Sequence, residues 1–218
     1  MANPTFELRT LTFLDSLQPQ LAHFIPEEEM VHAPAEYDAM LIIEIAPSME
    51  IHAMVDLALK RTQVQLGALV TERYFGQLFL QHADQGEVIE AGREIMRATG
   101  LDENSRAKIE VLTNKIIRSV EPDHAAYFNI DAKNNKVKPG ESVLLIETTP
   151  AAYSVIACNE ALKAANVKLI TIRPYGATSR LIMSGLESEI DSAAEAALKV
   201  IDKLNEMRAN KNHKQLGS

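Results

Sequence analysis

The stretch that decides the fold is Ser142–Gly185, with the sequence SVLLIETTPAAYSVIACNEALKAANVKLITIRPYGATSRLIMSG. Its apolar run Val143–Ile146 is followed by two threonines and Pro150, which is typical of a buried strand that leads into the first turn of a helix. A β-rich run, a turn around Gly176 and a returning strand come next. The segment between the first strand and the β-rich run is predicted to be a helix. Its packing face follows the spacing i, i+3, i+4, i+7 and i+8 and consists of Ser154, Ala157, Cys158, Ala161 and Leu162.

An earlier part of the chain repeats this stretch. Ser16-Leu17-Gln18-Pro19 reappears as Ser119-Val120-Glu121-Pro122, an offset of 119 − 16 = 103 residues. Identities held in one register over this length indicate duplication, and copies of this size predict two similar domains rather than a solenoid. We place the first domain at residues 1–105, the second at 106–208 and a disordered tail at 209–218. The same offset relates Leu41 to Leu144, Glu44 to Glu147, Pro47 to Pro150, and Ala58-Leu59-Lys60 to Ala161-Leu162-Lys163.

Each copy is predicted to contain a strand and a helix, then a strand, a helix, a hairpin and a last helix. This order predicts an α+β fold in which a small antiparallel sheet carries helices on one face. The opening strands are expected at Leu11–Leu14 and Lys115–Val120, and the first short helix is expected to run through Phe24 and Ile25. The closing helices are expected at Asp84–Ala98 and Glu187–Leu204.

Composition excludes several classes of protein. The 218 residues include 46% hydrophobic and 24% charged residues, the balance of a globular domain. No apolar run approaches the roughly 20 residues of a membrane-spanning helix, and the first residues lack a signal-peptide pattern, so we expect a cytoplasmic protein without membrane contact. A net charge of −8 disfavours nucleic acid as a partner, and a single cysteine cannot form an internal disulfide.

Motifs for catalysis or cofactor binding are absent from the sequence. There is no GxGxxG, GxxxxGK[ST] or GxSxG pattern, and the six histidines show no metal-ligand spacing. Cys158 lies on the apolar helix face, which favours a buried structural thiol over a nucleophile. Glu44 and Glu147 recur through duplication and are interpreted as structural. We therefore expect no enzyme activity, no cofactor and no metal site.

The segment NEALKAANVKL at Asn159–Leu169, followed by a glycine-containing hairpin and a strand ending in Gly185, resembles the core of the bacterial microcompartment (BMC) shell domain. DLALKRTQVQL at Asp56–Leu66 is a weaker version of the same segment. LTFLDSLQPQLAHFI at Leu11–Ile25 and NKIIRSVEPDHAAYFN at Asn114–Asn129 resemble the last strand and helix of that domain, which here come first. This order implies circular permutation, and the whole chain resembles the permuted tandem-domain class of shell proteins.

The resemblance implies an assembly and a set of functional residues. Members of this class form homotrimers that mimic hexamers, tile with other shell proteins into the facets of a microcompartment shell, and carry a central pore for small metabolites. Edge lysines of the family match Lys60 and Lys163. The pore loops match Arg73, Tyr74, Phe75 and Gly76 in the first copy and Gly176, Ala177 and Thr178 in the second. The first loop is bulky and basic where the family usually has glycines, and Arg73 would favour anions unless Glu72 neutralises it.

A second hypothesis is a tandem regulatory module with a related small α/β fold, which would bind an effector such as an amino acid between its domains. Composition does not separate it from a shell protein. The L-K-A-A-N-V segment and the permuted strand and helix favour the shell, because a regulatory module is expected to accompany a catalytic or DNA-binding domain.

Overall fold

The computed structural model describes residues 6–23 and 30–215, with side chains up to Arg208. The chain divides into two compact units. The first comprises residues 1–108 together with 203–218, and the second comprises residues 109–202. Each unit contains one four-stranded sheet in which all neighbouring strands are antiparallel. No helix of the described residues is both long enough and apolar enough to cross a membrane.

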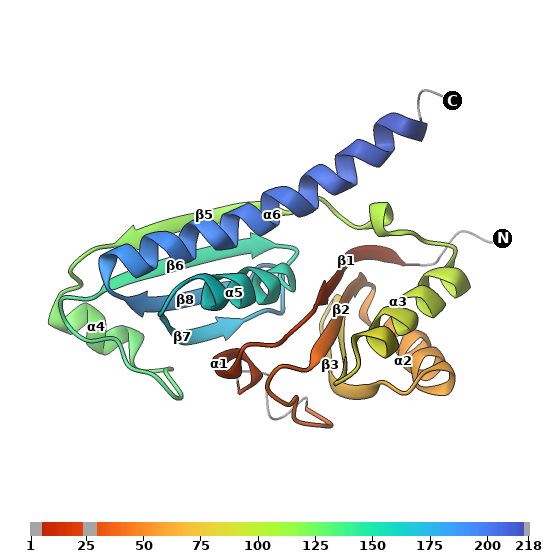
Figure 1. The fold of residues 1–218 in the computed structure, drawn as a ribbon, viewed down its shortest axis with the longest axis horizontal. Helices are drawn as coiled ribbons and strands as arrows, with labels where there is room; N and C mark the ends of the chain where they lie inside the picture. Colours follow the sequence, from red (N-terminus) through yellow and green to blue (C-terminus); the bar gives the residue numbers. More distant parts are fainter. Residues whose placement is uncertain (1–5, 24–29, 216–218) are drawn as a thin grey trace. The chain divides into compact units, whose positions relative to one another are not determined.

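The first unit has the strand order β1-β2-β4-β3, and its helices α2 and α3 pack on one face of this sheet (Figure 1). Helix α3 begins after Asp84, whose carboxylate accepts a hydrogen bond from the amide of Gly86, and ends at Gly100 in the left-handed conformation. The elements of the unit are β1 (Glu7–Leu14), α1 (Pro19–Ala22), β2 (Ala39–Ala46), a 3-10 turn (Ser48–Glu50), α2 (Ile51–Arg61), β3 (Gln65–Glu72), β4 (Phe75–His82) and α3 (Gln85–Thr99).

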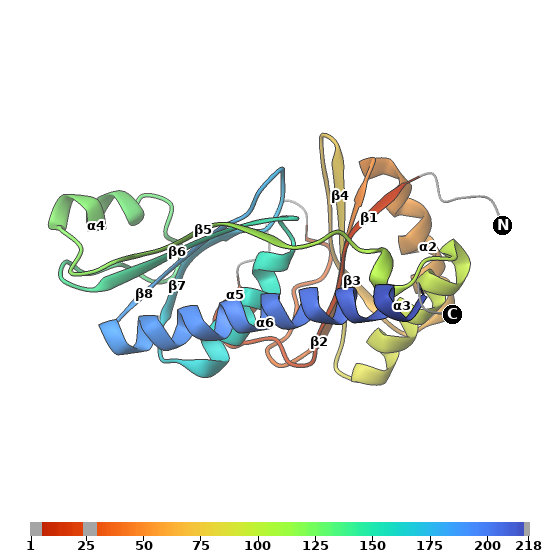
Figure 2. The same cartoon turned by 90° about the horizontal axis from the view of Figure 1, so that it is seen from above.

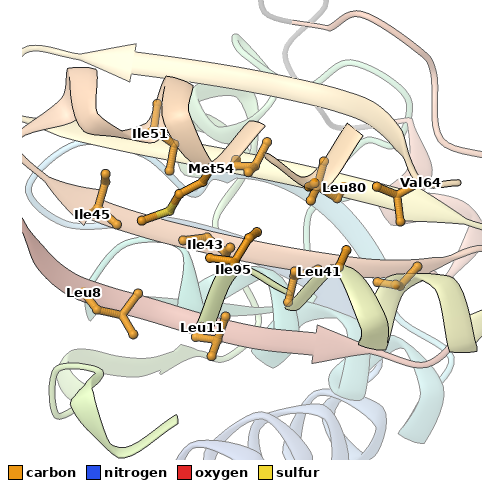
Figure 3. Close-up of a cluster of buried hydrophobic side chains, with 14 of the residues drawn as sticks. Leu8, Leu11, Leu41, Ile43, Ile45, Ile51, Met54, Val64, Leu80 and Ile95 are labelled. Atoms are coloured by element: carbon orange, nitrogen blue, oxygen red, sulfur yellow. The ribbon is translucent and has the colours of Figure 1, made fainter. Parts of the chain in front are cut away.

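The core of the first unit lies between its sheet and these two helices (Figure 3). Alternate residues of a strand point to one face, so every second residue of β2 meets the helices. The β2 side chains are Leu41, Ile43 and Ile45, and α2 adds Ile51 and Met54. All eight residues of β2 are buried, which is expected of a strand covered on both faces.

The second unit has the strand order β5-β6-β8-β7. Helix α5 and the part of α6 that belongs to this unit lie on one face of the sheet (Figure 2). Helix α4 and the loop after it pack on the opposite face, where Phe128 and Val137 contact the cluster around Val143 and Ile170. The elements are β5 (Glu110–Ile117), α4 (Pro122–Phe128), β6 (Ser142–Thr149), α5 (Tyr153–Ala164), β7 (Lys168–Arg173), β8 (Arg180–Gly185) and α6 (Glu187–Gln215).

The structure confirms the duplication. Strands β1 and β5, and likewise β2 and β6, have bounds that differ by the offset found in the sequence. The irregularity between Leu8 and Thr10 in β1 recurs between Val111 and Thr113 in β5. A bulge inserts one residue and changes which way neighbouring side chains point, so its conservation in both copies shows that the pairing register was duplicated with the sequence.

Several element boundaries differ from the prediction. Strands β1 and β5 begin at Glu7 and Glu110, before the predicted Leu11 and Lys115, because main-chain pairing with β2 and β6 also accepts polar side chains. Helix α1 ends at Ala22, and the predicted continuation through Phe24 and Ile25 lies outside the described residues.

Helix α6 runs to Gln215, although the sequence predicted its end near Leu204 and a disordered tail at 209–218. The Arg106 guanidinium donates to the carbonyl of Leu204 at 3.1 Å, and the Arg208 Nε donates to the carbonyl of Arg106 at 2.7 Å. These contacts join residues 203–208 to the first unit, whereas the sequence placed them in the second domain. Residues 216–218 lie outside the described residues.

Candidate functional site: the two hairpins and the helix-end lysines

The hairpin that joins β3 to β4 has Arg73 and Tyr74 at its tip. Glu72 pairs with Phe75 across the strands, so only these two residues form the turn. Both are exposed, and Tyr74 has 61% of its surface accessible. The backbone of Arg73 is left-handed, with φ of 52°. Residues other than glycine and, to a lesser degree, asparagine seldom adopt this backbone conformation, so the backbone of Arg73 is strained.

The base of this hairpin is held against the 3-10 turn at Ser48–Glu50. The Ser48 hydroxyl donates to the carbonyl of Arg73 at 3.1 Å. Gly76 is buried, and a Cβ atom added to it would lie 2.4 Å from the carbonyl oxygen of Ser48. Glycine at position 76 therefore allows a close approach of two backbones. Its place in a pore stays a prediction.

A polar row crosses the first sheet just below the hairpin. Thr10, Glu44 and Gln77 face one another on β1, β2 and β4, and all three are buried. The Arg9 Nε donates to one oxygen of Glu44 at 2.8 Å, and the Gln77 amide donates to the other at 2.8 Å. The Arg9 guanidinium also lies 4.3 Å from the ring centroid of Phe75, within range of a cation–π contact. The interpretation of Glu44 as structural is consistent with these bonds.

The equivalent hairpin of the second unit joins β7 to β8 and is held by hydroxyl groups. Thr178 donates to Glu147 at 2.7 Å, and Thr113 donates to the other oxygen of that carboxylate at 3.1 Å. The Ser179 hydroxyl lies 2.9 Å from the hydroxyl of Thr148, and the Thr149 hydroxyl donates to the carbonyl of Ala177 at 3.3 Å.

Gly176 has φ of 97° and occupies the repeat position of Arg73. Gly176 and Thr178 are half-buried, whereas Ala177 is exposed. The two turns differ in length, because two residues separate β3 from β4 whereas residues 174–179 separate β7 from β8. A positive φ falls on an arginine in the first turn and on a glycine, which adopts it freely, in the second.

The two lysines predicted at subunit edges lie in the last turns of α2 and α5. The Lys60 side chain is 72% exposed and forms an ion pair with Asp56 at 2.7 Å, one helical turn away. The Lys163 side chain is 27% exposed and forms an ion pair with Glu160 at 2.9 Å. Both lysines therefore lie at exposed helix ends, and the side chain of Lys163 is the less exposed of the two.

Cys158 is fully buried in α5, and this burial raises the pKa of its thiol far above the ordinary range. Such a thiol is not a nucleophile at neutral pH, as the sequence predicted. Within residues 6–23 and 30–215 no three histidine, cysteine or acidic side chains gather as metal ligands.

Sequence reasoning missed Arg9 and Ser48, which hold the first hairpin. One signal was available for Arg9, because its repeat position in the second copy is Leu112. When one copy has a charged residue where the other copy has an apolar one, the charged residue is expected to have a specific buried partner. The partner of Arg9 is Glu44.

The chain matches two domain families. The CsoS1D N-terminal domain matches residues 8–105, and the BMC domain matches residues 142–212. Similar solved structures include a fused permuted hexameric shell protein from the RMM microcompartment, with a TM-score of 0.88 and 37% identity over 91% of this chain and 98% of that one. A double ringed trimeric shell protein from the same microcompartment has a TM-score of 0.87 and 30% identity over 91% and 97%.

Relatives in sequence agree with these structures. The chain is 44% identical to carboxysome shell protein CsoS1D of Hydrogenovibrio crunogenus, over 91% of this chain and 97% of the relative. It is 35% identical to carboxysome shell protein CcmP of Synechococcus elongatus, over 91% and 93%. Both relatives are shell proteins, which are structural proteins and not enzymes. The chain therefore belongs to the permuted tandem-domain family of bacterial microcompartment shell proteins, and its role is structural.

Proposed function

We propose that three copies of this chain assemble into a ring that mimics a hexamer and occupies one position in a shell facet. Each chain contains two duplicated units, so three-fold symmetry supplies six similar domains around one axis. The relatives described as fused permuted hexameric and as double ringed trimeric support this assembly. Sedimentation should give a particle of three times, or six times if two rings stack, the 24.1 kDa chain mass, and a stable monomer would contradict the proposal.

The central opening of this ring is lined by the two hairpins. The observation that carries this proposal is the backbone of Arg73, which adopts a left-handed conformation although the second copy has glycine at the same position. A two-residue hairpin requires positive φ, which glycine would supply without strain, and residues strained in this way cluster at functional sites. Arg73 is exposed at the hairpin tip beside Tyr74, where it presents a cation and an aromatic ring.

Three such tips around an axis create a positive, aromatic constriction, and the tips of the second hairpin alternate with them and are small and uncharged. A ring of like charge raises the local concentration of counter-ions, so small anionic metabolites are the favoured solutes. Glu72 is adjacent and exposed, and it sets the size of this preference.

Charge reversal at the tip tests the pore. In planar bilayers or reconstituted shells, Arg73→Glu should shift the reversal potential toward cation selectivity. The matched control is Arg93→Glu, which makes the same charge change at an exposed position of α3 in the same unit. If the parent protein and the Arg73→Glu variant have equal ion selectivity, the first hairpin does not line the pore.

Tiling of the rings with one another and with other shell proteins is assigned to Lys60 and Lys163. Lys60, whose side chain is the more exposed of the two, supports this role more strongly than Lys163. Changing both to aspartate should leave rings intact and abolish sheets seen by electron microscopy. The control is Arg93→Asp with Lys199→Asp, which places the same charge change at exposed positions of α3 and α6. Sheets that form normally from the double lysine variant would contradict the edge role.

The alternative of a tandem regulatory module loses its support from the family assignment, because relatives that match almost the whole chain are shell proteins.

A further inference from the structure

We propose that Arg9 is a positioning residue for the tip of the first hairpin, because its guanidinium joins the buried carboxylate of Glu44 to the ring of Phe75. The effect of this positioning on solute passage rests on the proposed function, whereas the positioning itself does not. Arg9 lies far from the hairpin in sequence, on the edge strand β1, and nothing in the hairpin sequence indicates this contact.

The contact begins at a fixed point in the sheet. Glu44 lies in the central strand β2 and is fully buried, and its two oxygens accept from Arg9 and Gln77 at 2.8 Å each. The Arg9 side chain is itself only 14% exposed. Hydrogen bonds between buried charged groups are short and directional, so Glu44 fixes the position of the guanidinium.

The guanidinium contacts the hairpin through the rings of Phe75 and Tyr74. It lies 4.3 Å from the ring centroid of Phe75, the first residue of β4. The rings of Phe75 and Tyr74 then meet edge to face, with centroids 5.5 Å apart. A planar cation over one ring and an edge-to-face contact with the next restrict the rotamers of both rings. The chain of contacts therefore runs from Glu44 to the exposed Tyr74.

The β-bulge gives a reason why Arg9 can reach Phe75. The register of β1 against β2 shifts between Leu8 and Thr10, and Arg9 is the residue at this shift. Bulges commonly redirect a side chain toward a functional site. The second copy keeps the bulge but has Leu112 and Thr178 at the positions of Arg9 and Phe75. The contact is therefore specific to the first hairpin, while the scaffold is common to both.

Hydrogen–deuterium exchange on the assembled protein tests this inference. Phe75→Leu removes the ring but leaves the Arg9–Glu44 ion pair, so the buried carboxylate stays neutralised. Amide exchange in residues 71–77 should accelerate about fivefold to tenfold. Exchange in residues 174–180 should stay unchanged and serves as an internal reference. Arg9→Lys, which keeps a cation beside Glu44 but replaces the planar group, should give a smaller acceleration, and Leu112→Ala should give none.

Two outcomes separate this inference from the proposed pore. If residues 71–77 exchange at parental rates in both Phe75→Leu and Arg9→Lys, Arg9 does not position the hairpin and the inference is overturned. If exchange accelerates as expected while conductance and ion selectivity match the parent protein, the positioning role is supported and the pore-lining role of the hairpin fails.

Discussion

The two hairpins occupy the same position of a duplicated fold, yet they are held by different chemistry. The first rests on a buried ion pair, a cation over an aromatic ring and a glycine against a backbone carbonyl. The second rests on hydroxyl groups that donate to a half-buried carboxylate and to backbone carbonyls. Duplication therefore preserved strand pairing and register, and the side chains around each turn diverged to present a bulky, basic tip and a small, neutral one.

The largest expected effect comes from removing Arg9, the cation on β1 that contacts the first hairpin. Arg9→Ala leaves Glu44 fully buried without its cation, and loss of one partner of a buried ion pair costs roughly 3–5 kcal/mol of unfolding free energy. Leu112→Ala, at the equivalent position and 49% exposed, should change stability by less than about 0.5 kcal/mol. Urea denaturation of the two variants measures the difference, and equal stabilities would show that the copies do not differ in this way.

Gly76→Ala is expected to have the next largest effect. The added Cβ would lie 2.4 Å from a carbonyl oxygen that belongs to the backbone, so the hairpin must shift, at a cost of roughly 2 kcal/mol. Ser179, at the same repeat position, already carries a Cβ, so Ser179→Ala adds no clash. It removes a hydroxyl that accepts from the buried amide of Thr148 at 2.9 Å and lies 2.9 Å from the hydroxyl of Thr148, which should cost about 1–3 kcal/mol. Thermal unfolding would contradict the steric argument if Gly76→Ala left the stability of the protein unchanged.

A smaller effect is expected from Thr178→Val. This variant keeps the shape of the side chain but removes the donor to Glu147 at 2.7 Å, which should cost about 1 kcal/mol because the carboxylate is only half-buried. Thr178→Ser retains the hydroxyl and is the matched control. Denaturation midpoints that do not separate the two variants would show that the hydroxyl does not hold the second hairpin.

The smallest effect is expected from exchanging the residue with positive φ. Arg73→Gly removes backbone strain, but glycine also gains freedom in the unfolded chain, so the net stabilisation should be about 0.5 kcal/mol. Gly176→Ala should change stability in the opposite direction, because Gly176 has φ of 97°. Destabilisation by Arg73→Gly would mean that the arginine side chain contributes more than its backbone strain costs.

Much of the fold was predictable from local pattern. The period of the apolar residues identified α2, α5 and the central strands, and the 103-residue offset identified the two copies, because both signals depend only on spacing along the chain. The positions of the hairpins followed from the same spacing. The ends of β1, β5 and α6 were not predictable, since strand pairing and contacts to Arg106 extend these elements through polar residues.

The sequence by itself determined the duplicated α+β domains, the two unlike hairpin turns and the absence of motifs for catalysis. Only the tertiary structure showed how each turn is held. The contacts of Arg9 with Glu44 and Phe75 join residues that are distant along the chain, and they depend on a bulge and on strand order. Periodicity records which face of an element is apolar, whereas a buried ion pair is decided by which strands become neighbours.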